Sequence, residues 1–315
     1  MQTVQANDRH ALPQLSGKLF LTDGGLETTL IFHDGIDLPY FAAFDLLKTD
    51  EGREALGRYF RSYAEIAARD GVGLILETAT WRASKDWGAK LGYTAADLAR
   101  ANRQSVALLE DIRDEFAGVP IVISGCVGPR GDGYNPAFQM TTEEAEAYHA
   151  AQVHTFAGTA ADLVTAITMT YTEEATGVAQ LARAAQIPAV ISFTTETDGK
   201  LPSGQDLQEA IETVDAATNG YPLYYMLNCA HPEHFQNVLT GDWTERIRGL
   251  RANASRMSHA ELDEAEELDD GNPDELAAQY NELRAQLKNL NVMGGCCGTD
   301  HRHVGAISRA CKALA

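Results

Sequence analysis

Residues 290–300 read LNVMGGCCGTD, a short apolar run that passes directly into two glycines, two adjacent cysteines and a third glycine. A short apolar run that stops at glycine is typical of a buried strand followed by a turn. Seven similar runs rich in Val, Ile and Leu precede it along the chain. We therefore predict eight strands: Lys18–Thr22, Val72–Glu77, Ile121–Ser124, Leu163–Thr168, Ala189–Phe193, Leu223–Leu227, Ile247–Leu250 and Leu290–Met293.

Longer stretches with the spacing of amphipathic helices lie between these strands. The predicted helices are Glu51–Arg69, Ala95–Phe116, Thr142–Ala160, Glu173–Ala185, Asp206–Thr218, Pro232–Leu239, a longer one within Ser258–Leu287, and Arg302–Leu314. Eight strand-helix units in 315 residues predict a single-domain α/β fold over residues 1–315, a (β/α)8 TIM barrel with residues 1–16 as an N-terminal extension. A doubly wound open sheet is the alternative. The barrel is favoured because the chemically distinctive residues follow strands, and a barrel gathers all eight strand ends around one mouth.

The composition limits the class of protein. The chain is 44% hydrophobic and 22% charged, and a chain of this length buries about 75% of the surface that its unfolded form exposes. Its 45 Asp and Glu against 25 Lys and Arg give a formal charge of -20, the opposite of what a nucleic-acid-binding surface needs. Nine of these acids lie in residues 261–275, inside an acidic helical segment near 258–287. That segment is either a solvated face or a contact surface, so a homo-oligomer stays open.

The sequence points to the reducing interior of the cell. Residues 1–16 lack an apolar core segment, and no later run approaches the ~18 apolar residues that a membrane span needs. The five cysteines are an odd number without a secretory signal, which argues against a disulfide framework and for reduced thiols. We therefore expect a cytoplasmic protein without a membrane or nucleic-acid partner.

Three cysteines follow strands and could share a metal ion. Cys296 and Cys297 have glycines on both sides, and Cys229 follows the sixth predicted strand, on the same rim of the barrel. Three thiolates with one open position are typical of a catalytic zinc site, whereas the alternative is that the cysteines are buried small hydrophobic residues. Cys126, just after a strand, and Cys311, on the last helix, fit that second interpretation. The histidines near the thiols, which could supply a fourth ligand, are His231, His234, His301 and His303.

These motifs resemble the homocysteine S-methyltransferase family over almost the whole chain. The resemblance rests on Asp23-Gly24-Gly25 after the first strand, Asn228-Cys229 after the sixth, and GGCCGT over residues 294–299 after the eighth. It implies a (β/α)8 barrel and a zinc ion held by three cysteines, which here would be Cys229, Cys296 and Cys297. It also implies two small-molecule partners. Homocysteine would bind the metal through its sulfur, and a sulfonium, S-methylmethionine or S-adenosylmethionine, would donate the methyl group that gives methionine.

The chemistry of this site fits the residue types. A thiol bound to zinc is deprotonated, and three further thiolates keep its sulfur electron-rich enough to attack a methyl carbon. The positive sulfonium suits an acidic mouth, and the reaction requires in-line placement of the reacting atoms rather than a general base. Asp23 and the backbone N–H groups of Gly24 and Gly25 are expected to hold the amino-acid end of the acceptor, with Asp23 as a turn residue the alternative. Asn228, next to Cys229, is a further candidate substrate contact.

The sequence departs from the family pattern at the substrate pocket. Ile167 stands where relatives carry a glutamate that grips the acceptor's ammonium, and Trp81 and Arg82 replace a Tyr-Gln pair. Glu77, at the end of the second strand, either takes over the missing role or forms a salt bridge to Arg82 or Arg130.

Two further points bear on the function. The glycine-rich stretch 125–133 lacks a phosphate-loop ending and is predicted to be a loop over the mouth that could contact the donor. The alternatives to homocysteine methylation are another thiol or selenol acceptor, another methyl donor, or a non-catalytic zinc or thiol scaffold.

Overall fold

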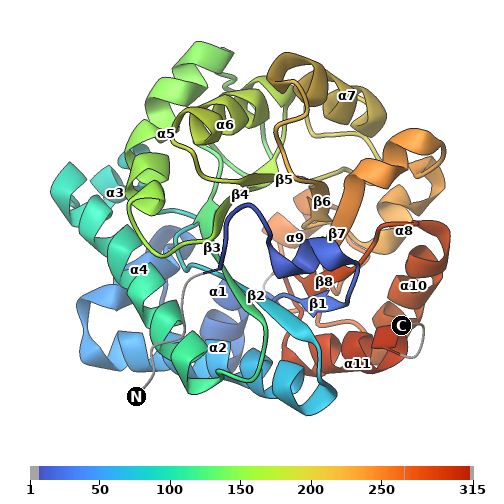
Figure 1. The fold of residues 1–315 in the computed structure, drawn as a ribbon, viewed down its shortest axis with the longest axis horizontal. Coiled ribbons are helices and arrows are strands. Elements are labelled where there is room, and N and C mark those ends of the chain that lie inside the picture. The colour runs from blue at the N-terminus through green and yellow to red at the C-terminus, as the bar shows by residue number, and fades with distance from the viewer. Residues whose placement is uncertain (1–6, 266, 313–315) are drawn as a thin grey trace.

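Eight parallel strands pair in chain order, and the first pairs with the last, so the sheet closes into a barrel (Figure 1). The computed structural model describes residues 7–265 and 267–312. The strands are β1 Phe20–Leu21, β2 Gly73–Glu77, β3 Ile121–Val127, β4 Leu163–Met169, β5 Ala189–Phe193, β6 Tyr225–Asn228, β7 Ile247–Ala252 and β8 Val292–Gly295. The closure, in which Phe20 pairs with Val292, confirms the (β/α)8 barrel and rules out the open sheet.

All eight predicted strands are present, and the differences lie at their ends. β1 is only two residues long, whereas β3 extends past its predicted end and contains Cys126. β8 is displaced toward the cysteines, so Gly294 and Gly295 belong to the strand rather than to a turn. A Cβ atom on either glycine would collide with a threonine side chain, Thr22 or Thr299, so close packing requires glycine at both positions.

Helices surround the barrel, as Figure 1 shows. Their bounds are α1 Leu26–Thr28, α2 Asp50–Asp70, α3 Lys85–Lys90, α4 Ala95–Glu115, α5 Thr142–Ala157, α6 Thr172–Ala184, α7 Leu207–Thr218, α8 Pro232–Phe235, α9 His259–Asp263, α10 Pro273–Gln286 and α11 His301–Lys312. The predicted helix over Pro232–Leu239 is a short α-helix followed by a 3-10 turn at Gln236–Val238. Within the described residues, no helix has the length and apolar character needed to cross a membrane.

The acidic segment does not form the single longer helix that we predicted. α9 ends at Asp263, and the described residues between it and α10 are not helical. Gly271 adopts a φ of +54°, and the side chain of Asn272 accepts hydrogen bonds from the N–H groups of Asp274 and Glu275. With Pro273 in the first turn, these residues form a helix start that interrupts the segment.

Residues 7–16 close the amino end of the barrel, near the centre of Figure 1. Leu12 is buried in a cluster with residues from the amino-terminal parts of the strands, such as Ile75, Val122 and Val190. The Asn7 side chain donates to the carbonyl oxygen of Ile121 and to Asp162. The part of the predicted extension that the structure describes is therefore packed into the barrel; residues 1–6 lie outside the described residues.

Candidate active site

The three predicted cysteines meet at the carboxyl ends of β6 and β8. The sulfur atoms of Cys229, Cys296 and Cys297 all lie within 4.8 Å of one another. Cys229 and Cys296, whose Cα atoms are 5.3 Å apart, are joined as a disulfide, and Cys297 is free. The two strand ends therefore bring these sulfurs so close that they can pair with each other or, when reduced, share a metal ion.

Asn228 holds together the strand ends next to the cysteine cluster. Its side-chain oxygen accepts hydrogen bonds from the Thr168 N–H (3.0 Å) and the Ser192 hydroxyl (2.6 Å), and its Nδ2 donates to the Thr168 hydroxyl (2.8 Å). Thr168 and Cys229 both adopt left-handed backbone conformations, with φ of +63° and +54°. The amide thus holds three strand ends together at two strained positions. Asn228 is fully buried and does not line the cavity, so we assign it a positioning role instead of the predicted substrate contact.

Two residues that the sequence did not single out complete the surroundings of the cysteines. The Tyr134 hydroxyl lies 3.4 Å from the Cys297 sulfur, and its ring stacks on His259 with the centroids 3.9 Å apart. His259 Nε2 lies 2.7 Å from the Cys229 carbonyl oxygen, and Nδ1 lies 3.1 Å from Glu196. Residues of the β3–α5 loop and α9 are thereby tied to the thiol cluster.

The histidines considered as a fourth ligand have other partners. His231 caps α8 by accepting a hydrogen bond from the Glu233 N–H, and burial lowers its pKa to about 4. His234 contacts the Arg256 carbonyl oxygen, and His303 lies between Asp300 and the Asp270 carbonyl oxygen. His301 is exposed at the start of α11. In the described part of the chain, none of these four histidines belongs to the sulfur cluster or lines the cavity above it.

A cavity of about 200 Å³ opens onto the cysteines. Its wall combines aromatic and apolar side chains with five acids, two arginines and four cysteines. The lining side chains include Asp23, Glu27, Phe41, Glu77, Trp81, Arg82, Cys126, Asp132, Tyr134, Ile167, Cys229, Arg251, Asp263, Cys296 and Cys297. The predicted glycine-rich loop contributes Asp132 and Gly133, which supports its placement over the mouth, whereas Gly125 to Val127 belong to β3.

Asp23 and its glycines lie where predicted, but the Asp23 carboxylate and the Gly25 N–H are engaged within the protein. The Tyr59 hydroxyl donates to Asp23 Oδ2 (3.0 Å), and Arg251 Nη2 lies 2.8 Å from Oδ1. Burial raises the pKa of Asp23, and the Arg251 charge opposes that rise. The Gly25 N–H donates to the Thr299 carbonyl oxygen, so it is not free for a substrate carboxylate.

Glu77 points into the barrel and lines the cavity. The hydroxyls of Thr165 and Ser124 hydrogen-bond to its carboxylate, yet burial raises its pKa to about 7. Oε2 has no hydrogen-bond partner among the described residues. The acid therefore lines the cavity with one carboxylate oxygen that is buried and has no partner among these residues.

The predicted salt bridge from Glu77 to Arg82 or Arg130 is wrong. Arg82 is stacked against Trp81 and Trp87, 4.0 and 3.7 Å from the ring centroids, and donates to the Gly131 carbonyl oxygen. Arg130 pairs with Asp86 in the outer loop, 2.9 Å away. Both arginines stabilise the loops around the mouth rather than the acid inside it.

The two remaining cysteines are separate from the cluster. Cys126 is buried in β3 and lines the cavity, and burial raises its thiol pKa well above the usual value. Cys311 is buried in α11. Neither belongs to the group of three sulfurs.

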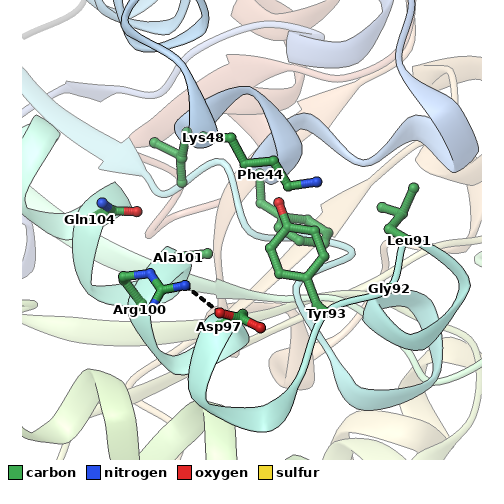
Figure 2. A pocket seen from close by; sticks show the side chains of 10 residues that line it. Phe44, Lys48, Leu91, Gly92, Tyr93, Asp97, Arg100, Ala101 and Gln104 are labelled. Atoms are coloured by element: carbon green, nitrogen blue, oxygen red, sulfur yellow. Dashed lines mark hydrogen bonds and ion pairs between the residues drawn. The ribbon is translucent and has the colours of Figure 1, made fainter.

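A second cavity, of about 260 Å³, lies outside the barrel between the 3-10 helix Ala43–Lys48 and the start of α4 (Figure 2). Its charged groups are already paired, Arg100 with Asp97 and Lys48 with Asp45. The Tyr93 hydroxyl also donates to Asp45 (2.8 Å). It holds no cysteine, so the cavity above the thiol cluster is the better candidate for chemistry.

Comparisons with known proteins agree with this geometry. A family model described as homocysteine S-methyltransferase matches residues 20–311. Homocysteine S-methyltransferase 1 of Arabidopsis thaliana is 24% identical over 322 residues, which cover 94% of this chain and 94% of the plant protein. Two structures of the homocysteine methyltransferase MmuM from Escherichia coli share the fold at 21% identity. The metallated form has a TM-score of 0.70 and covers 93% of this chain and 96% of its own. The oxidized form has a TM-score of 0.74, with 96% and 99% covered.

Proposed function

The chain belongs to the homocysteine S-methyltransferase family, and from this premise we propose that it methylates homocysteine with a sulfonium donor and a zinc ion. The donor would be S-methylmethionine or S-adenosylmethionine, and the product methionine. The observation that carries the proposal is the convergence of the Cys229, Cys296 and Cys297 sulfurs beneath an acidic cavity.

The donor set fits zinc. Three cysteine sulfurs from two strand ends lie within 4.8 Å of one another and face a cavity, which matches three protein ligands with a fourth position left for substrate. Zinc bound by these three residues would hold the acceptor sulfur as a thiolate, the form that attacks a methyl carbon. The Asn228 amide and His259, bonded to the backbone around Cys229, keep that cysteine aimed at the cluster.

The wall of the cavity suits a positively charged donor. Glu27, Asp132 and Asp263 place carboxylates along it, and their negative potential attracts a sulfonium. Phe41 and Trp81 add aromatic faces, against which a cation is stabilised by the ring quadrupole. Because the sulfonium becomes neutral on transfer, these groups bind the donor more tightly than its product.

The residues that line the cavity supply placement rather than proton transfer. Methyl transfer needs the acceptor sulfur, the methyl carbon and the leaving sulfur in one line. A site that holds both reactants in this geometry removes the entropic cost of bringing them together in the reaction step. Tyr134, stacked on His259 and 3.4 Å from the Cys297 sulfur, fixes one side of that line. No general base at the methyl group is required.

A second candidate keeps this chemistry and changes the acceptor to another thiol or a selenol. The observation that favours it is Ile167, whose apolar side chain lines the cavity where relatives would grip an ammonium. Thiols that lack an ammonium therefore belong in the same assay, and selenohomocysteine tests a selenol in place of the thiol.

The test measures metal and activity on the same protein, purified under reducing conditions without chelators. We expect about one zinc per chain and formation of methionine from homocysteine with S-methylmethionine or S-adenosylmethionine. Cys297→Ser should lose both zinc and activity and keep its circular dichroism spectrum. Cys311→Ser, in a buried cysteine outside the cluster, is the matched control and should keep both. Metal-free wild type that is active, or zinc-loaded protein that methylates no thiol with any sulfonium, overturns the proposal.

A further inference from the structure

We propose that Arg251 binds the carboxylate of an α-amino-acid acceptor while Glu77 binds its ammonium, so that these two residues select a zwitterionic thiol. The inference rests on the proposed function and names the part of the site that recognises the acceptor. It assigns a specificity role to an arginine of β7 that belongs to neither the metal cluster nor the Asp23-Gly24-Gly25 motif.

Arg251 is a buried cation, and one of its guanidinium nitrogens has no hydrogen-bond partner among the described residues. The residue is 5% exposed. Nε donates to the Gly295 carbonyl oxygen (3.2 Å), and Nη2 donates to that of Gly24 (3.2 Å) and pairs with Asp23. Nη1 has no hydrogen-bond partner among residues 7–265 and 267–312. An unpaired N–H of a buried guanidinium costs free energy, which an incoming carboxylate would recover. Because Arg251 lines the cavity, a ligand can supply that carboxylate.

The register of the barrel places Arg251 under the thiols. Arg251 pairs with Asn228 on β6 and with Gly294 on β8, and Asn228 directly precedes Cys229. A thiol acceptor whose sulfur lies at the cysteine cluster therefore extends its other end toward the level of this guanidinium. That end carries the carboxylate and the ammonium in an amino acid such as homocysteine.

Glu77 supplies the opposite charge. It is also 5% exposed, lines the same cavity, and leaves Oε2 without a partner in the described part of the chain. In the described part of the chain, Arg251 forms an ion pair with Asp23 and none with Glu77. The negative charges of Asp23 and Glu77 both act to raise the pKa of Arg251. Glu77 Oε2 and Arg251 Nη1 therefore place an anionic and a cationic atom, each without a hydrogen-bond partner among the described residues, on the wall of one cavity, the complement of a zwitterion.

The other charged groups of the cavity are less suited to this role. The Asp23 carboxylate is paired with Arg251 and bonded to Tyr59, so it keeps the arginine in place instead of meeting an ammonium. Arg82 is stacked between two tryptophans. Ile167 has no polar atom. Glu27, Asp132 and Asp263 also line the cavity but are less buried than Glu77 and Arg251. Glu77 and Arg251 are therefore the buried pair of opposite charge that is best placed to meet both ends of a zwitterion.

The test is a binding titration of the zinc-loaded protein by calorimetry with three thiols. Homocysteine carries both charges, 3-aminopropane-1-thiol lacks the carboxylate, and 4-sulfanylbutanoate lacks the ammonium. We expect wild type to bind homocysteine about tenfold to a hundredfold more tightly than either analogue, the usual range for one lost charge-assisted hydrogen bond. Wild type that binds homocysteine and the carboxylate-free thiol equally overturns the inference.

Two variants assign the preferences to residues. Asp23→Asn with Arg251→Gln removes both members of the buried pair, so that no single charge is left behind. This double variant should bind homocysteine and 3-aminopropane-1-thiol within about twofold, yet keep its preference over 4-sulfanylbutanoate. Glu77→Gln should bind homocysteine and 4-sulfanylbutanoate within about twofold and keep its preference for homocysteine over 3-aminopropane-1-thiol. Should the double variant not fold, Arg251→Lys keeps the charge but loses the planar fork, and should lower the preference about tenfold.

The matched control is Arg113→Gln with Asp162→Asn. These residues form another buried Arg-Asp pair, 3.3 Å apart and not in the cavity wall, so both preferences should persist. If the Asp23 and Arg251 variants also keep both preferences while homocysteine is still methylated, the inference is wrong and the proposed function stands. If zinc-loaded wild type binds none of the three thiols, both are wrong.

Discussion

Replacing Glu77 by glutamine removes a buried negative charge from the cavity and preserves the size of the side chain. In the free protein that charge is a burden, because burial raises the carboxyl pKa from an ordinary 4.5 to about 7. In the acceptor complex the same charge would meet an ammonium. Glu77→Gln should therefore stabilise the free protein and weaken the binding of homocysteine, whereas the loss of a merely structural contact would lower stability.

The size of the stability effect follows from the pKa. The difference between 4.5 and about 7 corresponds to about 3 kcal/mol between the two protonation states. Because the pKa is raised by folding, the stability that protonated Glu77 contributes is fully present below pH 4.5 and is lost as the pH rises through about 7. The free energy of unfolding of Glu77→Gln should thus exceed that of wild type by up to about 3 kcal/mol near pH 8, and the gap should close toward about pH 4.

Urea unfolding across this pH range measures the first effect, and titration with homocysteine measures the second. The matched control is Glu174→Gln, in a buried carboxylate that accepts hydrogen bonds from the Arg130 N–H and His149 and does not line the cavity. It should destabilise the protein and leave homocysteine affinity unchanged. A Glu77→Gln protein that is less stable than wild type near about pH 8, or that binds homocysteine as tightly, refutes the reasoning.

Three further outcomes are expected. Peroxide should inactivate the metal-free enzyme faster than the zinc-loaded one, with a Cys229–Cys296 disulfide detected by mass spectrometry; equal rates would count against a shared metal site. Asn228→Ala removes three buried hydrogen bonds, so it should lower the free energy of unfolding by about 2 to 4 kcal/mol and reduce zinc content, as urea titration and metal analysis would show. Leu12→Ala should cost about 2 to 4 kcal/mol in the same titration with kcat unchanged, because Leu12 packs at the barrel end opposite the cavity; an altered kcat would contradict that placement.

The fold was predictable because barrel strands are short and apolar on both faces. Runs such as Ala189–Phe193 stand out against amphipathic helices, and that strand has the bounds we predicted. The acidic segment was mispredicted because its charge masked the helix start. Gly271, Asn272 and Pro273 carry the signal for a break, and capping chemistry should outweigh charge pattern in such a stretch.

The site was predictable only where its residues sit at strand ends. The three cysteines could be placed together because strand ends share one rim. Arg251 was missed because it lies inside β7, one residue beyond the end of the predicted strand. The sequence does not show whether the side chain at this position points into the barrel or away from it. Its partner Asp23 is 228 residues earlier, and only the closure of β8 onto β1 brings the two together. Tyr134 and His259 depend on loop conformation, which periodicity does not report.

Chemistry and acceptor recognition occupy different strands of this barrel. The sulfurs come from the ends of β6 and β8, whereas the unpaired charges come from β2 and β7 and the apolar Ile167 from β4. Neither the side chain of Glu77 on β2 nor that of Ile167 on β4 makes a hydrogen bond to the cluster in the described part of the chain, whereas Thr168 and Arg251 are bonded to Asn228 and Gly295 beside the cysteines. With Ile167 on β4 and Glu77 on β2, an acceptor bound as proposed would place its ammonium toward β2 while its sulfur stays at the cluster. If the proposal holds, acceptor choice should follow the charges at positions 77, 167 and 251, and the three clustered cysteines alone should not predict it.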